Sequence, residues 1–142
     1  MIGQLAESHE EPVYSVVRAL IGVLFMQHGL QKVFGLFGGV DGSGGTVSLN
    51  SLYGIAGIVE LLGGLLIVIG VGTRLVAVIT AGEMVTAQVL EHLPNGLIPI
   101  ENGGELGLLY IASFLLLIVY GSGQYSIDRL IRGHEQSNYS SN

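Results

Sequence analysis

The fold is decided by residues 52–69, which read LYGIAGIVELLGGLLIVI. Glu60, near the middle, is the one charged residue in this stretch. A continuous apolar run of this length suffices for one helix across the hydrocarbon core of a membrane, which is about 30 Å thick. The stretch therefore predicts a transmembrane helix that carries a single carboxyl group.

Three more apolar stretches occur in the chain, at residues 13–36, 74–93 and 105–120. Pro12 suits the start of the first helix, and a cluster of glycines suits its end. Gly70 and Gly72 favour a tight turn, after which Thr73 can cap the next helix. Residues 94–104 hold two prolines and three glycines, a composition that favours a loop at the membrane surface.

These stretches predict an all-α integral membrane protein, a four-transmembrane-helix bundle that occupies residues 13–132. Residues 1–12 are predicted to form an acidic N-terminal tail, and residues 125–132 a short turn at the interface. Residues 133–142 are mostly polar and are predicted to be a disordered C-terminal tail.

The composition supports a membrane protein and excludes several functions. The chain has 142 residues, of which 49% are hydrophobic and only 11% charged, whereas soluble domains carry about a quarter charged residues. The net charge is −6 and no basic cluster occurs, so we expect the lipid bilayer, and not nucleic acid, as a partner. Because the chain has no cysteine, it cannot form disulfides or cysteine-ligated clusters. The histidines lack a paired motif, so no bound metal or haem is expected.

The distribution of basic residues predicts the orientation. In a four-helix arrangement, both termini and the turn at residues 70–72 lie on one side of the membrane. The four arginines, at positions 18, 74, 129 and 132, fall on that side, and Lys32 falls on the other. The side richer in Lys and Arg normally stays cytoplasmic. We therefore predict a multi-pass protein of the cell membrane with both termini in the cytoplasm.

Ionisable residues inside the spans are the candidate functional residues, because each costs a few kcal/mol to insert. In the first helix Arg18, Phe25 and Lys32 recur with two glycines at spacings of three and four, which places them on one face with His28 at its edge. This face can line the bundle interior. Alternatively, Arg18 and Lys32 can extend to opposite interfaces of the membrane.

Glu60 is surrounded on its helix by alanine and glycine, which let another helix or a flat ligand approach closely. By depth, Arg18 is its expected partner, and the pair serves either a proton-handling site or a structural link between two helices. Glu83 lies between threonines 80 and 86 and can bond to their hydroxyl groups. Glu105 follows Asn102 by three residues, as in a capping box, and is expected near Lys32.

Four blocks of residues between positions 18 and 128 resemble the DoxX family. The blocks are Arg18, Gly22, Phe25, His28-Gly29, Lys32 and Phe34-Gly35; Glu60, Gly63-Gly64, Gly70 and Thr73-Arg74; Gly82-Glu83-Met84, Ala87, His92, Pro94, Gly96 and Asn102-Gly103-Gly104-Glu105; and Gly121-Ser122-Gly123, Ser126 and Asp128. The resemblance implies a four-helix membrane protein linked to quinone metabolism and oxidative stress. It supplies no settled set of catalytic residues.

Two hypotheses about function follow. In the first, the chain is the membrane subunit of a quinone-linked oxidoreductase, and Glu60, His28 and Arg18 handle the protons or carbonyl groups of a quinone. The residues expected to contact the ligand are Lys32, Glu83, Glu105 and Phe25. The electrons are expected to come from a redox partner protein. A homo-oligomer is the other expected assembly. In the second, the chain is a non-catalytic anchor or assembly factor. A small transporter is less favoured, because four short helices leave little room for alternating access.

Overall fold

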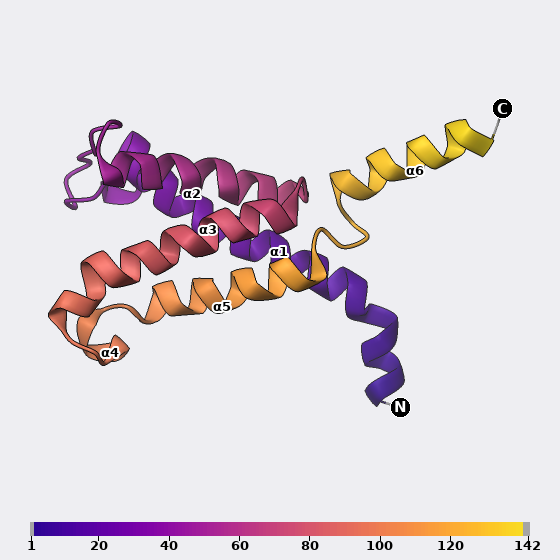
Figure 1. Ribbon diagram of the computed structural model, residues 1–142, viewed down its shortest axis with the longest axis horizontal. Helices are drawn as coiled ribbons and strands as arrows, with labels where there is room; N and C mark the ends of the chain where they lie inside the picture. Colours follow the sequence, from indigo (N-terminus) through magenta and orange to yellow (C-terminus); the bar gives the residue numbers. More distant parts are fainter. Residues whose placement is uncertain (1, 141–142) are drawn as a thin grey trace.

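The computed structural model describes the backbone of residues 2–140 and the side chains of residues 9–133. Four long helices lie side by side (Figure 1): α1 (Ile2–Phe34), α2 (Leu52–Ile69), α3 (Thr73–Ala87) and α5 (Glu105–Tyr120). Short elements join them, namely η1 (Leu36–Gly38), the π-helix η2 (Gln88–His92), η3 (Leu93–Asn95) and α4 (Pro99–Asn102). Helix α6 (Ile127–Ser140) follows the bundle, and no strand occurs within residues 2–140.

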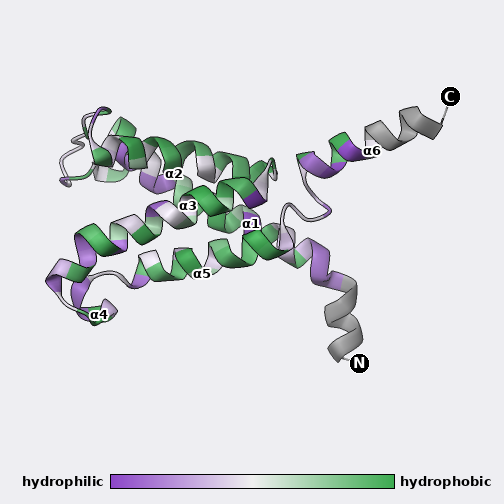
Figure 2. Cartoon of the chain, viewed as in Figure 1, coloured by the Kyte–Doolittle hydropathy of each residue, from purple (hydrophilic) through white to green (hydrophobic). Residues whose placement is uncertain are grey.

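Among the described residues, three helical segments are long and apolar enough to cross a membrane: His9–Phe34, Leu52–Ile69 and Thr73–Asn95. Helix α5 is a shorter apolar helix beside them. Figure 2 shows the hydrophobic colour along these four helices and hydrophilic segments toward α4 and the start of α6. Large apolar side chains such as Leu75 and Leu109 point outward and are 68% and 65% exposed, as lipid-facing residues are. The fold is that of an all-α membrane protein.

Helix α1 begins ten residues before the predicted start, so the expected boundary at Pro12 is wrong. Proline lacks the N–H that an interior helical position donates, and it also clashes with the preceding turn. The helix nevertheless runs through Pro12 from Ile2. The predicted acidic tail is therefore the first part of α1, which leaves the bundle at the same end as α6 (Figure 1).

The C-terminal segment also differs from its prediction. Helix α6 runs to Ser140, where the sequence predicted a short turn and then a disordered tail. Its first residues alternate apolar and charged side chains at helical spacing, and that pattern continues the helix beyond the turn. The last two positions of the predicted tail, 141 and 142, lie outside the described residues.

Two predicted helix caps take other forms in the structure. Gly72, with φ of 56°, is the N-cap of α3, and Thr73 is its first helical residue with no hydrogen bond to its hydroxyl. The side chain of Asn102 accepts a hydrogen bond from the N–H of Gly104 at 2.8 Å, so it stabilises the turn before α5 and not the helix itself. Neither residue acts as the cap that its sequence context predicted.

Helices α1 and α2 pack with their backbones in contact, because glycines face each other along the interface. A Cβ atom placed on Gly22 would lie 2.7 Å from the carbonyl oxygen of Gly64, and one on Gly29 would lie 2.6 Å from that of Gly57. Small residues permit this close approach in membranes, where van der Waals contact drives helix association. The pairs fix the register of α1 on α2 and hence which side chains meet.

Candidate functional site

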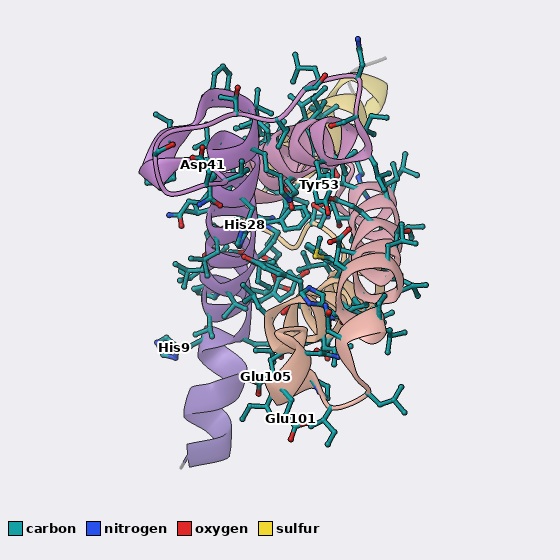
Figure 3. The ribbon with its side chains drawn as sticks, turned by 90° about the vertical axis from the view of Figure 1, so that its left-hand side faces the viewer. His9, His28, Asp41, Tyr53, Glu101 and Glu105 are labelled. Carbon is teal, nitrogen blue, oxygen red and sulfur yellow. The ribbon has the colours of Figure 1, made fainter. Side chains whose placement is uncertain are left out.

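A cavity of about 590 Å³ opens between α1, α2, α3 with η2, and α5. It lies toward the end of the bundle where α1 ends and α2 begins; Figure 3 views that end and labels His28 and Tyr53, two of its lining residues. Most of the lining is apolar. As in sites that bind small molecules, polar side chains interrupt this apolar surface, among them Lys32, Glu60, Glu83 and Glu91.

Lys32 of α1 and Glu60 of α2 form an ion pair at the cavity wall. The Glu60 side chain is 3% exposed and that of Lys32 is 22% exposed, so the pair is shielded from the solvent on the carboxylate side. The prediction that Arg18 pairs with Glu60 is wrong. The glycine contacts place Lys32 against Gly57, one helical turn from Glu60, and this register brings the lysine to the carboxylate.

Glu83 of α3 lines the same cavity, and both of its carboxyl oxygens are buried without a hydrogen-bond partner among the described residues. The expected bonds to neighbouring threonines do not form. Thr80 donates to the carbonyl oxygen of Val76 at 3.0 Å, and Thr86 donates to that of Gly82 at 2.9 Å. One oxygen of Glu60, Oε2, is also buried and unpartnered. Unsatisfied buried oxygens are costly, and three of them at one cavity indicate a place where a polar ligand group can bind.

Aromatic side chains form another wall. Phe25 packs edge-on against Tyr110 and Phe114 of α5, with ring centroids 5.2 and 4.9 Å apart. His28, on the next turn of α1, contacts Tyr110 edge-on at 5.8 Å. These edge-to-face contacts are the arrangement that aromatic quadrupoles favour. They fix the half-buried imidazole of His28 at the cavity surface.

The π-helix η2 closes one side of the cavity. Its Gln88 donates a hydrogen bond to the carbonyl oxygen of Gly104, and its His92 lies with Nδ1 at 3.1 Å from the carbonyl oxygen of Asn102. A π-helix widens the turn and often occurs at functional sites. Here it ties the end of α3 to the segment that leads into α5.

Arg18 lies at the opposite end of the bundle, in a site made of carbonyl groups. The guanidinium donates to the carbonyl oxygens of Ser122, Tyr125 at 2.9 Å and Val68 at 3.4 Å. The residue is only 3% exposed, so neither extension to the interface nor pairing with Glu60 describes it. Ser122 in turn donates its hydroxyl to Asp128 at 2.6 Å. The arginine joins α1 to α2 and to the segment before α6.

Of the seven predicted site residues, five line the cavity: Phe25, His28, Lys32, Glu60 and Glu83. Arg18 and Glu105 do not. Glu105 is exposed at the start of α5, labelled away from His28 in Figure 3, and no ion pair joins it to Lys32 within the described side chains. Sequence reasoning missed Tyr110 and Gln88. Tyr110 and Phe114 stand four residues apart on α5, a spacing that places two aromatic rings on one face and was the available signal.

Fold and site together define a polytopic membrane protein with a cavity between its helices that carries one ion pair and two further carboxyl groups, those of Glu83 and Glu91. Residues 13–93 match the DoxX family. The chain belongs to this family.

Several relatives match most of the chain, among them proteins of Haemophilus influenzae, Bacillus subtilis and Escherichia coli. A Haemophilus influenzae protein is 32% identical over 125 residues, which cover 86% of this chain and 92% of that protein. The Bacillus subtilis protein named "Putative oxidoreductase CatD" is 31% identical over 128 residues, covering 88% and 92%. Inner membrane protein YqjF of Escherichia coli is 33% identical over 128 residues, covering 82% and 89%. No solved structure matches the chain.

Proposed function

We propose that this protein binds a lipophilic quinone in the cavity beside the Lys32–Glu60 ion pair and acts as the membrane subunit of a quinone-linked oxidoreductase system. The observation that carries the proposal is the set of buried, unpartnered carboxyl oxygens of Glu60 and Glu83, two residues that line the cavity. The name of the Bacillus subtilis relative, "Putative oxidoreductase CatD", agrees with this class of activity.

The residues at the cavity fit a quinone in both of its hydrogen-bonding forms. The carbonyl oxygens of a quinone accept hydrogen bonds, and Lys32 and His28 are nearby donors. The hydroxyl groups of a hydroquinone donate, and the free oxygens of Glu60 and Glu83 are acceptors. Phe25 and Tyr110 offer flat aromatic surfaces, and about 590 Å³ holds a substituted ring with part of an apolar tail.

When bound, a quinone supplies the capacity to take up or release two electrons together with two protons. The residues of this chain position its oxygens and hold protons at Oε2 of Glu60 and at either carboxyl oxygen of Glu83. The apolar lining excludes water from these groups. The chain has no cysteine and therefore no thiol pair that could reduce a quinone, so the proposal includes a partner protein that supplies the electrons. A second copy of the chain is the other expected assembly.

We also propose four membrane spans with both termini in the cytoplasm. Helix α5 has 16 residues and a length of about 24 Å, so its flanking residues complete the crossing. Arg74, Arg129 and Arg132 gather at the end of the bundle from which the N-terminal part of α1 and helix α6 project, and Lys32 lies toward the other end. This distribution favours a cytoplasmic location for the first of these ends.

The test of quinone binding uses the full chain purified gently in mild detergent. Wild-type protein is expected to retain quinone, detected after solvent extraction by mass spectrometry, and to melt at a higher temperature when a short-chain quinone is added. Glu83→Gln removes one carboxylate of the site without changing its shape and is expected to weaken binding. Glu101→Gln, an exposed change on α4 outside the cavity, is the matched control and is expected to bind as wild type does.

The proposal fails if wild-type protein retains no quinone and its melting temperature does not respond to one. It also fails if Glu83→Gln binds quinone with wild-type affinity. Co-purification of a partner protein with an unoccupied cavity would support the anchor or assembly function instead.

A further inference from the structure

A second cavity, of about 470 Å³, lies at the opposite end of the bundle from the first. The turn between α2 and α3, the end of α5 and the start of α6 enclose it. Its charged lining residues are Arg74, Arg129 and Arg132 together with Glu11 and Asp128. The quinone proposal uses none of them.

Thr73 marks the point where a ligand can bind. It is the first residue of α3, lines the cavity and is 0% exposed, yet its hydroxyl oxygen has no hydrogen-bond partner among the described residues. The first N–H groups of a helix have no carbonyl one turn before them, and the helix dipole makes this end positive. A hydroxyl group and free amides at one helix start form the common arrangement for binding a phosphate.

The charges around Thr73 leave a surplus of cations. None of the three arginines forms an ion pair within residues 9–133. The two acids are already bonded: Asp128 accepts from the N–H of Gly72 at 2.9 Å and from the hydroxyl of Ser122, and Glu11 accepts from the N–H of Gln124 at 3.0 Å. Three guanidinium groups against two carboxylates give the cavity a net charge of +1. The partial positive charge at the start of α3 increases this positive potential.

The surroundings of the cavity point to a lipid as the source of the phosphate. Leu75 of α3, which lines the cavity, is 68% exposed, and so is Leu130 of α6, which follows the lining residue Arg129 in the sequence. Acyl chains can cover such side chains while the headgroup enters the cavity. We propose that this cavity binds the phosphate group of an anionic phospholipid through Thr73, the first amides of α3, and Arg74, Arg129 and Arg132.

The test compares the full chain in nanodiscs of phosphatidylcholine with and without phosphatidylglycerol. Phosphatidylglycerol is expected to raise the melting temperature of wild-type protein and to remain bound in native mass spectrometry. Arg129→Gln/Arg132→Gln is expected to lower its affinity about tenfold or more, because each guanidinium can make a charge-assisted hydrogen bond. Thr46→Asp/Asn50→Asp, in the exposed loop at the other end, changes the net charge equally and is expected to bind as wild type does.

Thr73 supplies a readout that separates binding from structural effects. Thr73→Val removes an unpartnered buried hydroxyl, so without phosphatidylglycerol its melting temperature is expected to equal or exceed that of wild type. With phosphatidylglycerol it is expected to gain less stability, whereas Thr73→Ser keeps the gain.

Equal stabilisation of both double variants by phosphatidylglycerol would overturn the proposal, as would an undiminished gain in Thr73→Val. In a third arm, inorganic phosphate is added to nanodiscs of phosphatidylcholine alone. If inorganic phosphate stabilises the protein as phosphatidylglycerol does, the ligand is a free phosphate and the lipid assignment is wrong.

Discussion

Gly22→Ala tests whether the contact between α1 and α2 determines the stability of the bundle. The added Cβ atom would lie 2.7 Å from the carbonyl oxygen of Gly64 and 2.8 Å from the backbone nitrogen of Val68. Ordinary contact begins at 3.4 Å, so the atoms fall short by 3.4 − 2.7 = 0.7 Å. Both neighbours are backbone atoms in a helix, so the clash is relieved only by separating the helices.

The expected loss can be worked from two opposing effects. Overpacking of this kind costs about 1–3 kcal/mol, and a gap of about 0.7 Å elsewhere along the interface removes part of its dispersion energy. Alanine favours the helix over glycine by about 0.8–1.0 kcal/mol, which offsets part of the loss. We expect Gly22→Ala to be less stable than wild type by about 1–2 kcal/mol.

Gly82→Ala on α3 is the matched control, because a Cβ atom there meets nothing within 4 Å. It keeps the helix-propensity gain and is expected to be up to about 1 kcal/mol more stable than wild type. The assay is reversible unfolding of both variants in mixed micelles, followed by circular dichroism. If Gly22→Ala is as stable as Gly82→Ala, the close contact between α1 and α2 is refuted.

Four further predictions follow from the site and its surroundings. Lys32→Gln leaves the Glu60 carboxylate buried without its cation and is expected to lower the free energy of unfolding by about 2–3 kcal/mol. Lys32→Gln/Glu60→Gln is expected to recover part of this loss in the same unfolding assay. Equal stability of all three forms would contradict this reasoning. Gly70→Ala places a Cβ atom at φ of 71° and against the Arg18 guanidinium, so a loss of about 2 kcal/mol is expected, and a neutral result would argue against the Arg18 site. Hydrogen bonds from the N–H groups of Ser43 and Gly45 lower the pKa of Asp41 to about 2. The Asp41 carboxylate therefore contributes to the order of its loop above its ordinary pKa, and this contribution disappears as the pH falls through about 2. Hydrogen exchange at the amides of Ser43 and Gly45 should accordingly stay slow at about pH 4. In this cysteine-free chain, Thr46→Cys should react with an impermeant maleimide in intact cells and Gly133→Cys only after permeabilisation, and the reverse pattern would refute the proposed orientation.

The sequence by itself determined the membrane class and the family. Continuous apolar runs predict spanning helices because each helix satisfies its own backbone hydrogen bonds, which is a local property. The bounds of α2 and α5 equal those of the runs at 52–69 and 105–120. The same local reasoning misplaced the start of α1, because proline disfavours an interior helical position without excluding it, and the helix runs through Pro12.

Tertiary structure alone decided which charges meet. Arg18, Lys32 and Glu60 could all be placed in spans from the sequence, but their partners depend on the register between α1 and α2. The contacts of Gly22 with Gly64 and of Gly29 with Gly57 set that register, and they bring Lys32 to Glu60 and Arg18 to the carbonyl group of Val68. A shift of one turn would change both partners, since charged side chains reach only a few ångströms and the pairing is a property of packing between helices.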